Sequence, residues 1–494
     1  MSQDGDSILE RTARGASWVV AWRMMTRALG LLSTLVLVRL LAPADFGLIA
    51  LASSFSVSIE AFSWIGIEEG VIRHKDPTPA LMDTAFTLSV LRGAVVFGIV
   101  AAVSVPAARF FGDPRLAAVL VALGATVLIE NLINVGTIEF RRDFEFRREF
   151  QLYLLPRVLS IVVAIVAAFM LHTYWALIAG IISNQVFRVM FSYTMHPYRP
   201  RFRLTAWRQI AGYSVWNSVI AGAGALRDRV DTMMVGRAMS SASVGFYALG
   251  YEIAGLPVTE LISPLTRAAF AGFAAAWREE EDAGQTWLRL VSTMALLTFP
   301  AGVGMSAVAY PLIMLAFGPG WEPAIPVMQV LGIPLCLTVF GMVGQTLFLA
   351  QGHMRVSLAI TVGATLLRLL LLWILIPPLG LYGAALAAGA GIAVEQSLSA
   401  VWAMRRLGLS PVCGLGPLMW RCVIATAAMA GVLWWSGLGW QGIGVLGMIG
   451  AIAVGAVSYG LVLLGLWLVC GRPVGPEADL LALLLRKPPR VTRA

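Results

Sequence analysis

Long apolar windows, separated by short polar segments, form the main pattern along this chain. A transmembrane helix needs about 20 consecutive and mostly apolar residues. Fourteen windows reach that length, at residues 16–41, 46–67, 84–110, 116–138, 151–171, 174–195, 210–236, 244–272, 287–316, 323–350, 355–376, 379–403, 418–437 and 441–470. The pattern predicts an all-α integral membrane protein with about 14 transmembrane helices, with the count open between 12 and 14.

The composition excludes several classes of protein. Of the 494 residues, 59% are apolar and 13% are charged, against about 25% charged in ordinary soluble domains. Fourteen spans occupy roughly 280 to 320 residues, which leaves no room for a sizeable domain outside the membrane. A soluble enzyme, a secreted disulfide scaffold and a disordered chain are therefore excluded.

No motif predicts a catalytic, metal or cofactor site. The four cysteines have no CxxC or zinc spacing, and no two of the four histidines stand four residues apart. Two GxGxxG matches, at 437–442 and 442–447, neither follow a strand nor open a βαβ unit. We expect no catalytic residue, no metal and no cofactor.

Lysine and arginine gather in alternate connections between the windows. The basic side holds Arg11, Arg14, Arg73, Lys75, Arg141, Arg142, Arg147, Arg148, Arg199, Arg201, Arg203, Arg208, Arg278, Arg355, Arg405, Arg406, Arg486, Lys487, Arg490 and Arg493. The positive-inside rule places these connections in the cytoplasm, with both termini and the tails 1–15 and 472–494. Most of the net charge of +9 then comes from residues that set the orientation of the chain in the membrane, so no nucleic-acid partner is expected. No A-x-A cleavage site precedes the first window, which predicts a retained helix.

The chain repeats internally at two offsets. At an offset of 198, a series of identities links residues 18–51 to 216–249, among them Gly47 with Gly245. A second ordered series, at an offset of 208, starts from Val135 with Val343 and ends at Ala179 with Ala387. Because six helices are an even number, both repeats enter the membrane from the same side and are related by an axis along its normal.

The repeat divides the chain into predicted parts. Residues 16–208 form an N-terminal six-helix bundle, and residues 209–408 form a C-terminal six-helix bundle. Helices 13 and 14, in residues 409–471, lie outside the repeat. A cleft between two such bundles is the expected position for charged groups that lie deep in the helices, because lipid exposure would cost about 2.5 to 3.5 kcal/mol for each.

Three arginines are candidates for cargo binding in that cleft. Arg23 and Arg27 are four residues apart and share one face of the first helix. At the offset of 198 they correspond to Ala221 and Ala225, and Arg229 continues the same stripe of the seventh helix. Guanidinium groups at successive depths suit a pyrophosphate, since arginine is always charged and grips phosphate oxygens bidentately.

Other deep charges and prolines leave alternatives open. The candidates for proton or cation coupling are Glu60, Asp228, Glu252 and Glu260, because burial raises a carboxylate pKa. Pro257 and Pro264 are candidate hinges, with kinked packing as the alternative. Interhelical ion pairs, or side chains that reach the membrane interface, are the expectation for Arg92, Glu130, Arg157 and Arg188.

Four stretches resemble a known family. They are VRLLAPADFGLIALASSFSVSIEAF at 38–62, FRRDFEF at 140–146, VGFYALGYEIAGLPVTELISPLTRAAFAGF at 244–273 and YPLIMLAFGPGWEPAIPVMQVLG at 310–332. They resemble the bacterial Wzx-type, colanic-acid-like polysaccharide flippases of the multidrug, oligosaccharidyl-lipid and polysaccharide exporter (MOP) superfamily. The resemblance implies a MATE-like fold of two six-helix bundles plus two helices. One departure is SWIGIEEG at 63–70, where relatives usually have an uncharged glycine-rich turn.

The resemblance also implies a function. It predicts export of undecaprenyl-pyrophosphate-linked oligosaccharide across the bacterial cytoplasmic (inner) membrane, for exopolysaccharide, capsule or lipopolysaccharide biosynthesis. In relatives the central cavity is cationic, and Arg23, Arg27 and Arg229 are the positions that can fill that role. The expected partners are the lipid-linked cargo, the bilayer, and polysaccharide polymerase and export machinery.

Rival functions differ in cargo or in class. A lipid II flippase or a multidrug exporter of the same superfamily would use the same architecture. A membrane-embedded glycan polymerase or ligase is disfavoured, because the external connections are short and poor in His, Asp and Glu. A structural scaffold does not explain so many arginines at depth. We therefore predict a non-enzymatic flippase that works by alternating access.

Overall fold

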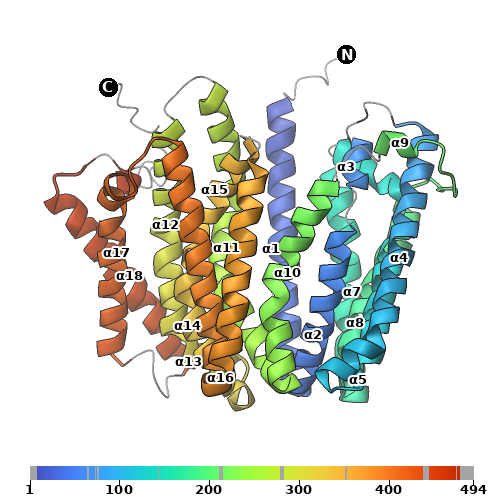
Figure 1. The fold of residues 1–494 in the computed structure, drawn as a ribbon, viewed down its shortest axis with the longest axis horizontal. Helices are drawn as coiled ribbons and strands as arrows, with labels where there is room; N and C mark the ends of the chain where they lie inside the picture. Colours follow the sequence, from blue (N-terminus) through green and yellow to red (C-terminus); the bar gives the residue numbers. More distant parts are fainter. Residues whose placement is uncertain are drawn as a thin grey trace. The chain divides into compact units, whose positions relative to one another are not determined.

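The computed structural model describes residues 8–63, 66–72, 74, 77–143, 145–210, 215–278, 283–350, 353–437, 444–473 and 475–478. Every regular element in these ranges is an α-helix or a short 3-10 helix, as the apolar windows predict (Figure 1). The contacts divide the chain into two compact units, Met1–Gly245 and Phe246–Ala494.

The first unit contains ten α-helices and one 3-10 helix in its described part. They are α1 (Ile8–Leu40), α2 (Pro43–Phe62), α3 (Ile67–Ile72), α4 (Pro79–Phe111), α5 (Arg115–Glu130), η1 (Val135–Thr137), α6 (Ile138–Arg142), α7 (Phe146–Leu171), α8 (Trp175–Met195), α9 (Trp207–Ile210) and α10 (Val215–Ala238). The last helix, α10, packs against α2. The division at Gly245 therefore lies beyond the predicted bundle boundary at 208–209, which stays a prediction.

The second unit begins within α11 (Ser241–Arg278). Its other elements are α12 (Ala283–Ala307), α13 (Ala309–Ala316), η2 (Pro319–Ala324), α14 (Ile325–Cys336), α15 (Thr338–Ala350), α16 (Met354–Arg406), α17 (Pro411–Trp435) and α18 (Val445–Val469). Here α12 and α16 both pack against α14, while α17 packs against α12 and α18.

Nine described helices are long and apolar enough to cross a membrane, or ten if the bent pair α5 and η1–α6 is one span. The 53 residues of α16 would reach about 80 Å if straight, far beyond the roughly 30 Å of hydrocarbon. A non-helical Gly380 (φ 55°, ψ −131°) breaks it just after Pro377 and Pro378. The fourteen predicted windows each overlap a helix, and the count of fourteen spans stays a prediction.

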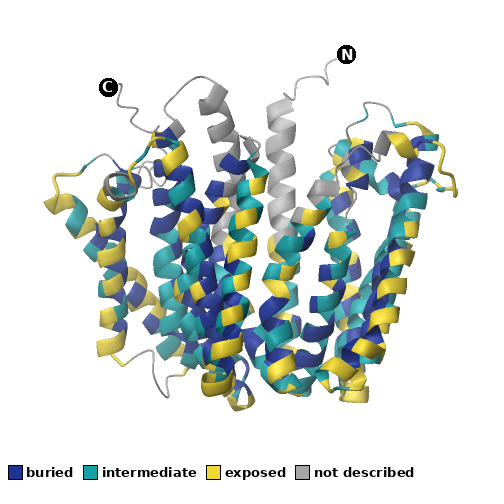
Figure 2. Cartoon of the chain, in the orientation of Figure 1, coloured by how far each residue is buried: buried dark blue, intermediate teal, exposed yellow. Residues whose placement is uncertain are grey.

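The spacing of exposed apolar residues identifies a lipid-facing surface. Leu91, Val95, Ile99 and Val103 are exposed and follow one another at intervals of four along α4, so they form one stripe of that helix. Figure 2 shows exposed residues along the outward side of α4 and buried residues on its opposite side. Such an apolar stripe is stable against hydrocarbon and unfavourable against water.

Small residues bring the helices of each unit into close contact. In the first unit, Leu37 of α1 and Leu41, the residue after α1, pack against Ala164 and Ala168 of α7. In the second, α12 and α14 cross at two glycines: a Cβ atom on Gly332 would lie 2.7 Å from the Gly302 carbonyl oxygen. Close backbone approach of this kind drives helix association in membranes, where no hydrophobic effect acts between helices.

Candidate functional site

Polar and charged side chains surround a cavity of about 190 Å³ in the first unit. The cavity is lined by residues from α2 to α8 and from η1, and four of these helices, α2, α4, α7 and α8, are long and apolar enough to cross a membrane. Its ionisable and aromatic polar members are Glu60, Glu68, Arg92, Glu130, Tyr153 and Arg188. Ionisable groups inside a membrane-spanning bundle are expensive and mark functional sites by default.

Two interhelical ion pairs stabilise this cavity. Arg92 Nη2 of α4 lies 2.9 Å from Glu60 Oε1 of α2, and Arg188 Nη1 of α8 lies 2.9 Å from Glu130 Oε1 of α5. Gln185 Nε2 also donates to Glu130, at 3.0 Å. The prediction of interhelical pairs is confirmed for Arg92, Glu130 and Arg188. Each pair compensates two charges that would be costly alone in a low-dielectric interior.

Tyr153 of α7 connects these charges to α1. Its ring stacks on Trp22 of α1, with centroids 4.9 Å apart, and the Arg188 guanidinium lies 4.6 Å from its centroid. Its hydroxyl accepts a hydrogen bond from Arg141 Nη2 at 3.1 Å. Both faces and the edge of one ring are therefore engaged, and the ring links α1, α6, α7 and α8.

Arg141 continues this network toward α3. Its Nε donates to Glu149 at 2.7 Å, and its Nη1 donates to Glu68 at 3.1 Å. Glu68 therefore connects α3 to α6 through an ion pair with Arg141.

A polar segment at 196–206 closes the cavity beyond Asn134. Asn134 Nδ2 donates to the Tyr198 carbonyl at 2.7 Å, and the Tyr198 hydroxyl donates to Asp83 Oδ1 at 2.6 Å. Burial, and then the hydrogen bond to Asp83, raises the pKa of Tyr198. The Arg201 backbone N–H also donates to Asp83, at 2.8 Å. Because two donors already hold the buried Asp83 carboxylate, we interpret its role as structural.

Arg157 of α7 differs from the paired arginines of the first unit. It is the twelfth residue of the 26-residue helix α7, about 16 Å from the first residue of that helix. Among the described residues, no carboxylate pairs with its guanidinium and no acceptor receives a hydrogen bond from it. The side chain is half-buried. Of the two expectations for Arg157, an interhelical ion pair is not seen among the described residues, and a side chain that reaches the membrane interface stays a prediction.

The predicted cargo-binding arginines have different environments. Arg27 is half-buried on α1, and Arg229 is exposed on α10. Arg23 lies in helical backbone, with its side chain outside the described residues. Their predicted alignment along one cleft stays a prediction.

Of the predicted coupling carboxylates, Glu60 is the member that lines the cavity. Asp228 is exposed and pairs with the neighbouring Arg227, with Nε and Oδ1 2.8 Å apart. Glu252 and Glu260 are both exposed on α11.

The predicted hinge prolines lie in one continuous helix. Pro257 is half-buried in α11, and the helical backbone of α11 also includes Pro264, whose side chain is outside the described residues. No described group of three or more His, Cys, Asp or Glu side chains has the arrangement of a metal site.

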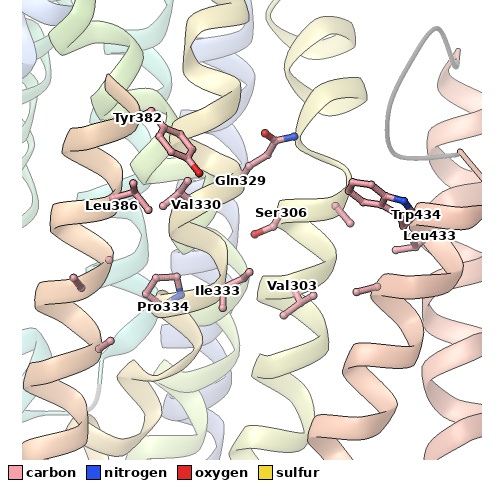
Figure 3. Close-up of a pocket in the computed structure, with 15 residues that line it drawn as sticks. Val303, Ser306, Gln329, Val330, Ile333, Pro334, Tyr382, Leu386, Leu433 and Trp434 are labelled. Atoms are coloured by element: carbon pink, nitrogen blue, oxygen red, sulfur yellow. The ribbon is translucent and has the colours of Figure 1, made fainter. Parts of the chain in front are cut away.

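The second unit contains an apolar groove of about 720 Å³ (Figure 3). Tyr382 and Leu386 of α16 lie on one side, and Leu433 and Trp434 of α17 lie on the other. Gln329 and Ser306 are polar exceptions in a lining of aliphatic and small residues. This lining suits hydrocarbon better than a charged group.

Sequence reasoning missed the role of Tyr153. A signal was present, because Tyr153 precedes Arg157 by four residues and so shares its face of α7. The identity of its partners depends on which helices are neighbours, and spacing along one helix carries no such information. Trp22, beside Arg23 in the sequence, was missed for the same reason.

The family model described as "Polysaccharide biosynthesis protein" matches residues 36–326, more than half of the chain. Lipopolysaccharide biosynthesis protein WzxC of Escherichia coli K12 is 24% identical over 369 residues, or 73% of this chain and 74% of that protein. Teichuronic acid biosynthesis protein TuaB of Bacillus subtilis 168 is 21% identical over 351 residues, or 70% and 73%.

Two solved structures share the fold. The inward closed conformation of the lipid II flippase MurJ aligns with a TM-score of 0.70 at 12% identity, over 92% of this chain and 99% of that one. An inward-facing multidrug resistance MATE transporter of the MOP superfamily aligns with a TM-score of 0.59 at 16% identity, over 78% and 94%. The expected MATE-like architecture is therefore confirmed at the level of the fold.

Proposed function

Because this chain belongs to the polysaccharide biosynthesis protein family and is a membrane transporter of the MOP superfamily, we propose that it flips undecaprenyl-pyrophosphate-linked oligosaccharide units across the bacterial cytoplasmic membrane. The cargo feeds exopolysaccharide, capsule or lipopolysaccharide biosynthesis. Two relatives, WzxC and TuaB, are named for lipopolysaccharide and teichuronic acid biosynthesis, which supports a glycan cargo.

The observation that carries this proposal is the charged cavity inside the first unit. Charged side chains inside a bundle of membrane-spanning helices lower its stability, so a protein with a purely structural role is not expected to contain them. The cavity contains four: Glu60, Arg92, Glu130 and Arg188. Such groups serve a transporter, which must offer a polar environment to a head group and must respond to an ion gradient. When no cargo is bound, the ion pairs compensate these charges and so stabilise the protein.

In the proposed cycle the pyrophosphate binds first to Arg23 and Arg27 of α1. The prenyl tail stays in hydrocarbon, and the head group passes toward Arg229 as the two bundles rock, with bending at Pro257 or Pro264. Both termini and the basic connections stay in the cytoplasm. Support for this order comes from the spacing of the three arginines along one stripe of the repeat.

Glu60 is the best candidate for proton coupling. It lines the cavity, and its partner Arg92 is held at 2.9 Å. Protonation of Glu60 would neutralise the carboxylate, break the ion pair and release the Arg92 guanidinium to an anion. Arrival of the anionic cargo and uptake of one proton are then linked through the same guanidinium.

A gene deletion tests the proposal. In the deletion strain, radiolabelled undecaprenyl-linked oligosaccharide should accumulate on the cytoplasmic side, and full-length surface polysaccharide should disappear. Complementation with the intact chain should restore the polysaccharide, and complementation with Arg27→Ala should not. Continued export in the deletion strain would refute a flippase function, and accumulation of lipid II in its place would identify the rival cargo.

A further inference from the structure

Among the described residues, the guanidinium of Arg157 contacts no carboxylate, whereas three other arginines of the first unit each contact one. Arg92, Arg141 and Arg188 each contact a carboxylate at 3.1 Å or less. Arg157 contacts none among the described residues. Two other carboxylates of the first unit are already engaged, because Glu60 pairs with Arg92 and Glu130 with Arg188. Within the described part of the chain, Arg157 is therefore a half-buried cation in the middle of α7 that has no carboxylate partner.

The direction of this side chain is set by a glycine on α1. The Arg157 Nη2 atom lies 3.0 Å from the position that a Cβ atom would take on Gly30. The guanidinium therefore lies against α1 at this glycine. Any side chain larger than hydrogen at residue 30 would press on it, so Gly30 provides the space that this guanidinium occupies.

The position fits the proposed route of the cargo. Gly30 follows Arg27 by three residues on α1, and residues at this spacing are neighbours on a helix surface. On α7, Arg157 follows Tyr153, which stacks on Trp22 of α1. On α1, Arg27 lies between Trp22, which contacts Tyr153, and Gly30, which contacts Arg157. Arg157 therefore lies beside the segment of α1 that contains the predicted phosphate-binding residue Arg27.

We propose that Arg157 is a cargo-binding residue that grips the diphosphate of the lipid-linked substrate together with Arg27. This inference rests on the proposed function, since it assigns a further residue to the same anionic head group. Arginine suits the task because its planar fork binds two phosphate oxygens at once. The same chemistry would accept free inorganic pyrophosphate, and the lipid-linked form is the ligand to which we assign the site.

Binding measurements on the purified full-length protein in lipid nanodiscs test the assignment. The probes are undecaprenyl pyrophosphate, undecaprenol and inorganic pyrophosphate. We expect Arg157→Gln to weaken binding of undecaprenyl pyrophosphate at least tenfold and to leave binding of undecaprenol unchanged. Arg157→Lys should lie between the two, because it keeps the charge and loses the bidentate geometry.

Matched variants separate this role from a general loss of folding. Gly30→Ala should weaken undecaprenyl pyrophosphate binding at least threefold by displacing the guanidinium. Gly98→Ala is its control, because no atom lies within 4 Å of an added Cβ there. Arg148→Gln, at an exposed arginine of the same helix, is the control for loss of charge. Both controls should bind all three probes as the unchanged chain does.

The outcomes distinguish this inference from the proposed function. If Arg157→Gln binds undecaprenyl pyrophosphate as tightly as the unchanged chain, the inference is wrong, and the deletion phenotype still decides the flippase function. If inorganic pyrophosphate binds as tightly as the lipid-linked form and depends equally on Arg157, the site binds a free anion and the assignment to cargo is overturned. If the unchanged chain binds no undecaprenyl pyrophosphate and the deletion strain still exports polysaccharide, the proposed function fails.

Discussion

Gly47 and Gly245, which the internal repeat aligns at an offset of 198, lie directly against each other. A Cβ atom on Gly47 would lie 2.7 Å from the Gly245 nitrogen, and one on Gly245 would lie 3.1 Å from the Gly47 nitrogen. The relation is reciprocal, because each added Cβ would also overlap a carbonyl oxygen four residues before the other glycine, at Ser241 and Pro43. The first turns of α2 and α11 therefore approach each other closely at these two glycines.

This crossing predicts the effect of adding one methyl group. Gly47→Ala and Gly245→Ala should each destabilise the protein by about 1 to 3 kcal/mol, because backbone atoms cannot yield as a side chain can. The measurement is the thermal unfolding midpoint in detergent. Gly98→Ala, at an open position of α4, should leave the midpoint unchanged or raise it. Equal unfolding midpoints for all three variants would contradict this prediction, because they would show that α2 and α11 can move apart without loss of stability.

The repeat and the apolar windows made much of the fold predictable from the sequence. The sequence aligns Gly47 with Gly245 at the offset of 198, and their contact in the structure depends on how α2 and α11 pack, which an offset does not give. The break of α16 at Gly380 was also visible, since two windows at 355–376 and 379–403 flank Pro377 and Pro378. The packing of α10 on α2 within the first unit was not visible, because apolar windows show burial and not partners.

The candidate site was predictable only in part, for a similar reason. The chain places Arg92, Glu130 and Arg188 deep in helices, and uncompensated charges there must find partners, so interhelical pairing was a sound expectation. Arg157 is the same kind of residue and has no described partner. Periodicity assigns each side chain a face of its own helix, and only the arrangement of neighbouring helices decides which charges meet.

The three contacts of Tyr153 predict a difference between two substitutions. Tyr153→Phe keeps the stack on Trp22 and the contact with Arg188, and loses only the hydrogen bond from Arg141. We expect it to cost about 1 kcal/mol and to complement the deletion strain. Tyr153→Ala removes the ring and should cost about 3 to 5 kcal/mol, measured as the loss of folded protein in detergent. If the two variants lose the same amount of folded protein, the hydroxyl group of Tyr153, and not its ring, makes the stabilising contact.

The Glu60–Arg92 pair predicts a separation of coupling from transport. Glu60→Gln cannot take up a proton, so transport driven by a pH gradient should fall at least tenfold in proteoliposomes, while exchange without a gradient should persist. The matched variant is Glu130→Gln, which removes the carboxylate of the other ion pair and should leave the dependence on the gradient intact. If Glu60→Gln keeps gradient-driven transport, Glu60 is not the coupling residue and another carboxylate must take up the proton.

Asp113 predicts a stability that depends on pH in the connection between α4 and α5. Hydrogen bonds from the Arg115 side chain, opposed by burial and assisted by Ser241, hold the pKa of Asp113 below its usual value. A carboxylate with a lowered pKa stabilises the folded state above the unfolded-state pKa near 3.9. That contribution to stability is lost as the pH falls through the lower pKa that Asp113 has in the folded state. Unfolding midpoints of Asp113→Asn and the unchanged chain should therefore differ at pH 7 and converge in acid; a constant difference would contradict this.

A buried ion pair fastens the segment after α18 to α17. Arg421 Nε lies 2.7 Å from Glu477 Oε1, Nη2 lies 2.9 Å from Oε2, and the two side chains are 6% and 3% exposed. Glu477→Gln leaves the guanidinium buried without its counter-charge and should cost about 3 to 5 kcal/mol. Glu145→Gln, in the exposed pair with Arg148 (43% and 55% exposed), should cost under about 1 kcal/mol. Replacing both partners, as Arg421→Met with Glu477→Leu, should recover most of the loss, because the cost arises from the charge left alone and not from the missing attraction.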